Sequence, residues 1–183
     1  ITSASSVSFA ENSTSTVITL TANDVDSDNV TYGISGTDVD DFNINSNSGD
    51  LTFKTAPNYE SPTDSDTNRE YVVIITATDD GSGNLTDTQT LTITVTDVND
   101  NPVVTAGGTL EYTENSNATA IDINITISDQ DDVQLSGATA TISSGFTTGD
   151  VLFLTGQNGI SGSYDHSTGV LTIRGTATVS EYQ

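Results

Sequence analysis

Short runs in which β-branched or aromatic residues alternate with polar ones recur along the whole chain, and they constrain the fold more than any other feature. Gly, Asn and Asp bound these runs, which is typical of strands, and no segment shows the 3.6-residue period of a helix. A spacing of roughly 8–12 residues indicates a β-sandwich. The sequence therefore predicts an all-β fold. The clearest runs are Val17-Ile18-Thr19-Leu20, Val30-Thr31-Tyr32-Gly33-Ile34, Tyr71-Val72-Val73-Ile74-Ile75-Thr76, Thr90-Leu91-Thr92-Ile93-Thr94-Val95, Ile121-Asp122-Ile123-Asn124-Ile125-Thr126-Ile127 and Val170-Leu171-Thr172-Ile173.

An internal repeat divides the chain into two similar parts. Phe9-Ala10-Glu11-Asn12 recurs about 100 residues later as Tyr112-Thr113-Glu114-Asn115, which leaves room for one sandwich per copy. Pro102 cannot donate to a strand ladder and marks the boundary. We expect two tandem Ig-like modules, residues 1–101 and 102–183. The second lacks counterparts of two long closing strands of the first, so we expect it to be truncated at its C-terminus.

The charge balance excludes several classes of partner. The chain has 183 residues, with 26 Asp and Glu against 3 Lys and Arg, and its formal net charge is −23. Nucleic acids and anionic membrane surfaces need clustered Lys and Arg, so we expect neither nucleic-acid binding nor direct membrane insertion. Cysteine is absent from the sequence, which excludes disulfides and thiol chemistry.

The acidic residues gather where strands are expected to end. Alternate residues of an extended segment face the same side, so Asp24 and Asp26 can share one ion, as can Asp129 and Asp131. Carboxylates about 4 Å apart repel by about 1 kcal/mol even in water. Oxygen ligands alone favour Ca²⁺ over zinc or copper. The clusters are Asp24-Val25-Asp26-Ser27-Asp28-Asn29, Asn68-Arg69-Glu70, Asp79-Asp80-Gly81, Asp97-Val98-Asn99-Asp100-Asn101 and Asp129-Gln130-Asp131-Asp132.

The order of these clusters in the first module resembles that of a cadherin repeat. That family has a Glu-Asn near its first strand, followed by Asp-x-Asp, Asp-Arg-Glu, Asp-x-Gly and an Asp-x-Asn-Asp-Asn linker. The matching residues here are Glu11-Asn12, Asp24-Val25-Asp26, Asn68-Arg69-Glu70, Asp79-Asp80-Gly81 and Asp97-Val98-Asn99-Asp100-Asn101. The resemblance implies an extracellular adhesion protein that holds Ca²⁺ between consecutive modules.

The resemblance also implies which residues bind the metal. A top half-site would contain Asp24, Asp26, Asn29 and Asp79, and we expect it to be empty or weakly occupied because its other half belongs to an upstream linker. Asn68 stands where the family has Asp, which weakens or removes one ion. The expected ligands between the modules are Glu11, Glu70, Asp97, Val98 (carbonyl), Asn99, Asp100, Asn101 (carbonyl), Asp129 and Asp131.

The second module departs from the cadherin pattern. It keeps Glu114-Asn115 and Asp129-Gln130-Asp131 but has no Asp-Arg-Glu and no terminal linker motif. Its segments Leu135-Ser136-Gly137-Ala138-Thr139 and Asn158-Gly159-Ile160-Ser161-Gly162-Ser163-Tyr164 resemble repeats of very large bacterial surface adhesins. We therefore expect a bacterial protein that is secreted or displayed at the cell surface.

Two functions fit these features. In the first, Ca²⁺ stiffens the junction and the modules serve as a spacer whose partners are the other modules of a long adhesin. In the second, the modules bind a cell-surface polysaccharide or another copy of themselves. Ser163, Asp165 and His166 lie close together in the sequence and are the residue types of a hydrolase triad. We nevertheless expect no enzyme activity, because Asp165-His166-Ser167-Thr168-Gly169 corresponds to the ordinary turn Asn45-Ser46-Asn47-Ser48-Gly49.

Overall fold

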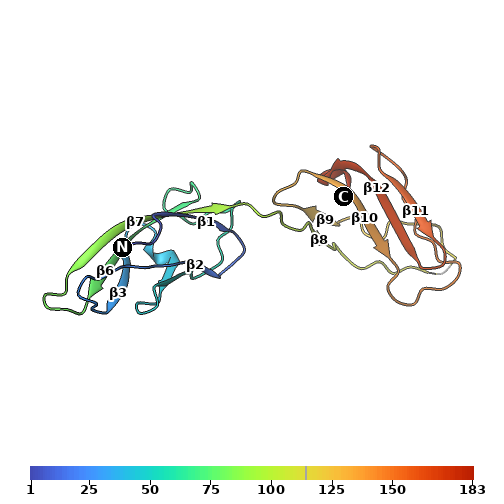
Figure 1. The fold of residues 1–183 in the computed structure, drawn as a ribbon. Coiled ribbons are helices and arrows are strands. Elements are labelled where there is room, and N and C mark those ends of the chain that lie inside the picture. Colours follow the sequence, from blue (N-terminus) through green and yellow to red (C-terminus); the bar gives the residue numbers. More distant parts are fainter. Residues whose placement is uncertain (114) are drawn as a thin grey trace. The chain divides into compact units, whose positions relative to one another are not determined.

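The computed structural model describes residues 1–113 and 115–183, and it divides into two compact units, Ile1–Asn99 and Asp100–Gln183 (Figure 1). The division falls two residues before the boundary expected from the sequence. The regular secondary structure of the described residues is β-strand apart from two short 3-10 helices, so the predicted all-β fold of two tandem β-sandwich modules is confirmed. Glu114, which belongs to the repeated Glu-Asn pair, lies outside the described residues.

The first unit is a sandwich of a four-stranded and a three-stranded sheet. The strand order is β1-β7-β6-β3 in one sheet and β2-β5-β4 in the other. β1 runs parallel to β7, whereas the remaining pairs are antiparallel. The elements are β1 (Ser6–Ala10), β2 (Thr16–Thr19), β3 (Val30–Ser35), η1 (Val39–Asp41), β4 (Phe42–Ile44), β5 (Asp50–Phe53), β6 (Glu70–Asp79) and β7 (Thr86–Thr96).

Alternation along the two longest strands builds the core of this unit. Tyr71, Val73 and Ile75 of β6 point inward and are at most 1% exposed, as are Leu91 and Ile93 of the neighbouring β7. Because side chains alternate between the faces of a sheet, the intervening residues face outward; these are threonines on β7, whereas on β6 they are the apolar Val72 and Ile74. The apolar and polar alternation seen in the sequence thus becomes one buried face and one hydrated face.

Four aromatic rings close the core between the two sheets. The Phe53 ring centroid lies 4.4 Å from that of Phe42 and 5.3 Å from that of Phe9. Tyr71 meets Phe42 and Phe53 edge-on, at 5.9 and 5.1 Å. The Tyr71 hydroxyl is satisfied, because it accepts a hydrogen bond from the Thr63 N–H at 3.2 Å. Edge-to-face contacts of this kind stabilise aromatic cores beyond their burial alone.

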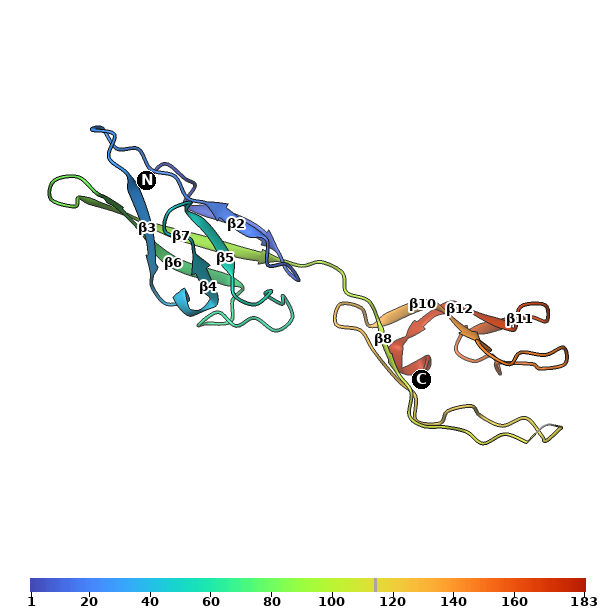
Figure 2. The same cartoon turned by 90° about the horizontal axis from the view of Figure 1, so that it is seen from below.

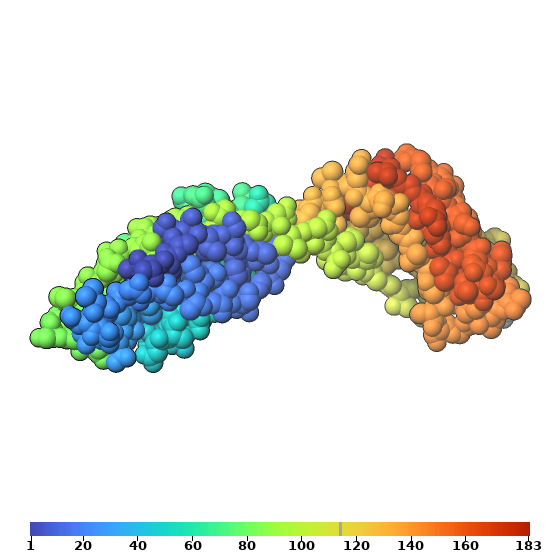
Figure 3. Space-filling view, in the orientation of Figure 1, coloured from blue at the N-terminus to red at the C-terminus, as the bar shows by residue number. Residues whose placement is uncertain are grey.

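The second unit has smaller sheets and a smaller core. Its sheets are β10-β12-β11 and β8-β9, and its buried hydrophobic residues among those described are Ile160, Leu171 and Ala177. In Figure 2 the connection from β8 to β9 runs alongside the three-stranded sheet but apart from it, and Figure 3 shows a gap between the yellow-green and the orange atoms of this unit. The elements are β8 (Val103–Thr105), β9 (Thr126–Ser128), β10 (Gln134–Thr141), β11 (Ser161–Asp165), β12 (Val170–Thr178) and η2 (Val179–Glu181).

Most strands predicted from alternation are confirmed, but the run from Ile121 to Ile127 is wrong over most of its length. Only its last two residues belong to β9, and Ile121 and Ile123 are 62% and 83% exposed. The Asp122 carboxylate accepts hydrogen bonds from the N–H groups of Gly107 at 2.6 Å and Asn124 at 2.8 Å. Such local bonds to a side chain compete with a strand ladder, which explains the difference.

The repeated turn before a strand has the same geometry in both units. Gly49 and Gly169 have φ values of 75° and 72°, in the left-handed region that favours glycine. Their N–H groups donate to the carbonyls of Asn45 at 2.9 Å and Asp165 at 3.0 Å. The turn in the second unit contains His166, whose ring packs edge-on against Tyr164. The predicted equivalence of the two turns is confirmed.

Within residues 1–113 and 115–183, the structure contains no helix of the length and apolar character needed to cross a membrane.

Shortening a core residue of β7 tests this account of the first unit. We expect Leu91→Ala to lower its free energy of unfolding by about 2–5 kcal/mol, because Leu91 is 0% exposed and its loss leaves a cavity. Urea unfolding followed by circular dichroism measures the change. Leu85→Ala is the matched control, because Leu85 is 70% exposed and its truncation should cost less than about 0.5 kcal/mol. Equal losses in the two variants would contradict the assignment of the core.

Candidate metal centre

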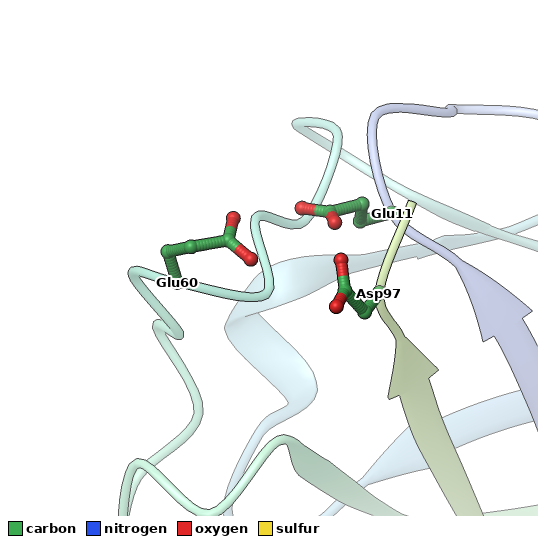
Figure 4. Close-up of side chains that lie close together, drawn as sticks. All are labelled: Glu11, Glu60 and Asp97. Atoms are coloured by element: carbon green, nitrogen blue, oxygen red, sulfur yellow. The ribbon is translucent and has the colours of Figure 1, made fainter. Parts of the chain in front are cut away.

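Three carboxylates from distant parts of the first unit converge at one place, the Glu11 group, which comprises Glu11, Glu60 and Asp97. One ligand oxygen of each lies within 4.8 Å of the others. Glu11 follows β1, Glu60 lies in the long connection between β5 and β6, and Asp97 follows β7. The three side chains point toward one another (Figure 4). Convergence of three negative charges is unfavourable without a cation.

The Glu11 carboxylate fixes the segments that carry the other two acids. It is the most buried of the three, at 3% exposure. Its Oε2 accepts a hydrogen bond from the Tyr59 N–H at 2.7 Å, and its Oε1 accepts one from the Val98 N–H at 2.8 Å. Tyr59 directly precedes Glu60, and Val98 directly follows Asp97. One buried side chain therefore sets the position of both partners.

The ligand set of the Glu11 group fits calcium. All three donors are carboxylate oxygens, which hard cations prefer, and the group contains no nitrogen or sulfur donor. Two cationic side chains of the first unit donate to carbonyl oxygens, Lys54 Nζ to that of Asp40 at 2.6 Å and Arg69 Nε to that of Tyr59 at 2.8 Å. When bound, Ca²⁺ would neutralise the carboxylates and hold their three segments together.

The structure brings together two of the residues expected here and adds one that the sequence did not reveal. Glu11 and Asp97 meet as expected, but their partner is Glu60. Glu70 begins β6, is exposed and lies outside this group of three, and its role as a ligand stays a prediction. A signal was present, because Asn-x-Glu occurs twice, as Asn58-Tyr59-Glu60 and as Asn68-Arg69-Glu70. The Arg between Asn68 and Glu70 favoured the second.

A second cluster in the first unit, the Asp28 group, contains Asp24, Asp28, Asn29, Asp79 and Asp80. Asp24 Oδ1 accepts hydrogen bonds from the N–H groups of Asp26 at 2.9 Å and Asp28 at 3.0 Å. Asp80 accepts two bonds from Asn29, through the backbone N–H at 2.9 Å and the side-chain amide at 3.0 Å. Asp24, Asn29 and Asp79 of the predicted half-site thus lie in one cluster with Asp28 and Asp80, and the role of this cluster as a calcium site stays a prediction.

The Asp28 carboxyl is partly dehydrated and is surrounded by like charges. Partial loss of hydration raises its pKa above the ordinary value of 3.8, and the neighbouring carboxylates of Asp24, Asp80 and Asp79 raise it further. Gly81 permits the crowding, because a Cβ at that position would lie only 2.0 Å from Asp28 Oδ2. A cation at this end would relieve the repulsion.

A third cluster, the Asp131 group, lies in the second unit and comprises Asp100, Asp129 and Asp131. The Asp100 N–H donates to Asp131 Oδ2, and the Gln130 amide donates to Asp100 Oδ2 at 3.0 Å. Asp129 Oδ1 accepts the N–H of Asp131 at 3.0 Å. The other oxygen of Asp131, Oδ1, is buried without a hydrogen-bond partner among the described residues. An oxygen in that state is suited to a cation.

The other expected ligands lie in the connection between β7 and β8 or in local turns of the first unit. Val98, Asn99 and Asn101 are exposed in the connection between β7 and β8. The Asn68 side chain forms a local turn, in which its Oδ1 accepts a hydrogen bond from the backbone N–H of Glu70 at 2.6 Å. Asp26 is exposed, and its backbone N–H contacts the Asp28 group by donating a hydrogen bond to Asp24 Oδ1.

A sequence profile described as Cadherin domain matches residues 5–96, which is half of the chain. The chain belongs to the cadherin family. The matched residues include Glu11, Glu60 and all seven strands of the first unit, so the Glu11 group lies at one end of a cadherin domain. A comparison with curated proteins gave no match.

Solved cadherin structures resemble the chain at low identity. Human protocadherin-24 EC1-2 is 22% identical, with a TM-score of 0.49, over 94% of this chain and 76% of that one. Drosophila N-cadherin EC1-4 is 19% identical, with a TM-score of 0.49, over 95% and 39%. Drosophila N-cadherin EC1-3 is 28% identical, with a TM-score of 0.44, over 51% and 31%. This cadherin therefore spans about a third of the N-cadherin EC1-3 structure.

Removing the Asp28 charge should stabilise the calcium-free protein at neutral pH. The folded pKa of Asp28 lies above its unfolded value, so its charged form opposes folding above that range, and the effect disappears below about pH 3.8. Thermal melts of Asp28→Asn in chelator, at about pH 7 and about pH 3, measure a rise in Tm at the higher pH only. Asp26→Asn controls for the general effect of one fewer negative charge, and an equal rise there would contradict the crowding.

Proposed function

We propose that this chain is a calcium-binding module of an extracellular adhesion protein, in which calcium stiffens the junction between consecutive modules. The observation that carries the proposal is the convergence of Glu11, Glu60 and Asp97 around one point. Membership of the cadherin family supports an extracellular adhesion role. The chain's charge of −23 supports the same reading, because so acidic a chain needs cations to keep its carboxylates close.

The junction itself is the natural place for shared calcium. Within the first unit Glu11 binds the N–H of Val98, and within the second unit Asp131 binds the N–H of Asp100. A single residue, Asn99, separates these two anchored positions in the sequence. The proposed ligand set is therefore Glu11, Glu60 and Asp97 on one side, Asp100, Asp129 and Asp131 on the other, and Val98, Asn99 and Asn101 between them.

Such a site would act mechanically. With calcium bound, opposing carboxylates share a cation and the connection between the units becomes stiff. Without calcium, their mutual repulsion favours an open, flexible connection. Extracellular calcium modules bind calcium with Kd near 10⁻⁴–10⁻³ M. At a free calcium concentration of ~10 Kd, each site raises the free energy of unfolding of the protein by about 1.4 kcal/mol.

We propose a spacer role, with other modules of the same protein as partners. The distinctive side chains of the first unit gather at its two ends, in the Glu11 and Asp28 groups, which supports stacking of modules over recognition by a face. Light scattering distinguishes this role from homophilic adhesion, which requires self-association that appears only with calcium. A polysaccharide partner would instead give retention on immobilised glycan.

Replacing Glu60 should weaken calcium binding more than replacing Glu70. We expect Glu60→Gln to lower the affinity by about tenfold, because it removes one of three converging carboxylates. A calcium titration followed through the amide NMR signals of Tyr59 and Val98 reports on this site alone, because both amides bind Glu11. Glu70→Gln is the comparison variant, since it removes the same charge from an exposed residue that lines the same groove but lies outside the group of three. Equal losses would contradict the assignment.

Calcium should also straighten the two-unit chain. We expect small-angle scattering to report a longer maximum dimension in millimolar calcium than in chelator. The Tm of the same samples should rise with calcium, because the ion binds the folded protein. A scattering profile and a Tm that are both unchanged by chelation would refute calcium binding, and a changed Tm with an unchanged profile would refute only the stiffening.

A further inference from the structure

The connection between β5 and β6 presents a structural problem for the Glu11 group. It runs from residue 54 to residue 69 without a strand or helix, yet it must hold Glu60 in place against two other carboxylates. A connection of this length is ordinarily mobile unless side chains tie it down. The residues that tie it down therefore decide whether Glu60 is available as a ligand.

Two buried carboxylates hold the far end of this connection through the backbone. Asp64 is 2% exposed, and it accepts the N–H groups of Asn68 at 2.7 Å and Arg69 at 3.2 Å. Asp38 is 4% exposed, and it accepts the N–H groups of Ser65 at 2.8 Å and Val72 at 2.7 Å. Both pairs of bonds are charge-assisted, so they fix the backbone more firmly than neutral bonds would.

These bonds impose an unusual backbone conformation at Arg69. Its φ is 72°, in the left-handed region that side-chain-bearing residues rarely adopt. Thr67, two residues earlier, has a φ of 57°. Such conformations persist where the surroundings over-determine them, and here the Asp64 carboxylate binds the Arg69 N–H directly.

The result is an arginine directed at the residue next to Glu60. The Arg69 guanidinium lies 4.3 Å from the centre of the Tyr59 ring, and its Nε donates to the Tyr59 carbonyl at 2.8 Å. The Tyr59 N–H is held in turn by Glu11 at 2.7 Å. Tyr59 is therefore held by contacts at its ring, its carbonyl and its N–H. Its carbonyl belongs to the peptide group that joins Tyr59 to Glu60.

We propose that Arg69 is a positioning residue for the calcium centre: held by Asp64, it fixes Tyr59 and so presents Glu60 to Glu11 and Asp97. This inference rests on the proposed calcium function. It gives a cationic side chain a favourable role in binding a cation, which electrostatics alone would not predict. Arg69, Tyr59 and Asp97 line one groove of about 350 Å³, so the arginine is close enough to repel the ion.

Repulsion of the ion by Arg69 and positioning of Glu60 by Arg69 predict opposite changes in calcium affinity when Arg69 is replaced, so one variant distinguishes them. If Arg69 acted only through its charge, Arg69→Gln would tighten calcium binding, because a nearby positive charge is removed. As a positioning residue, its loss frees Tyr59 and Glu60, and the affinity falls. Partners that orient metal ligands typically contribute 10-fold or more to affinity, so we expect Arg69→Gln to weaken binding by about tenfold.

The experiment is a calcium titration of the full chain followed by amide NMR. The Tyr59 and Val98 signals report on the Glu11 group, and the Asn29 signal reports on the Asp28 group as an internal reference. Arg69→Lys is the second variant, since it keeps the charge but loses the planar group that stacks on Tyr59. We expect it to weaken binding as well. Arg174→Gln, in the second unit, is the control for removing one positive charge.

The outcomes separate this inference from the function on which it rests. Weaker binding in both Arg69 variants, with an unchanged Asn29 titration and unchanged affinity in Arg174→Gln, supports positioning. Equal or tighter binding in Arg69→Gln overturns positioning while leaving the calcium function standing. Failure of the wild-type Tyr59 and Val98 signals to respond to calcium overturns both. A melt in chelator establishes that each variant is folded, and Arg69→Lys alone decides the question should Arg69→Gln not fold.

Discussion

The Glu11 carboxylate is the constraint on which the end of the first unit depends. It is nearly fully buried, and its two oxygens bind the backbone beside Glu60 and beside Asp97. A buried carboxylate is costly unless several donors satisfy it, and these two N–H groups do so. The same bonds draw two further acids toward it. The arrangement therefore lowers the cost of burying one charge but brings three charges close together, and a divalent cation would offset their repulsion.

The sequence predicted the strands of the first unit well because one physical rule governs them. A β7 side chain either enters the core or faces water, so its polarity indicates its direction. The run at Ile121 violated this rule because alternation cannot show whether a partner strand is present. Asp122 then bound Gly107 and Asn124 locally, and the alternating pattern had no ladder to join.

The candidate site was only partly predictable, for a different reason. Glu11 and Asp97 lie next to strands, so their positions follow from the fold. Glu60 lies in a long connection, where spacing along the sequence says little about position in space. Its place depends on Asp38, Asp64 and Arg69, which act through the backbone and have no recognisable spacing. The Asn-Arg-Glu tripeptide drew attention to Glu70, whereas the structure uses its arginine to hold the segment that carries Glu60.

The two acidic groups of the first unit, the Asp28 group and the Glu11 group, also differ in how their side chains are held. The Asp28 group crowds Asp24, Asp79 and Asp80 around one carboxyl, and partial loss of hydration together with this repulsion raises the pKa of Asp28. In the Glu11 group, two backbone N–H donors satisfy the Glu11 carboxylate, and Arg69 braces the connection that carries Glu60. Preformed ligands lose less conformational entropy when an ion binds than ligands that must first be ordered. Bracing by Arg69 therefore favours calcium at the Glu11 end, even though the arginine itself carries a positive charge.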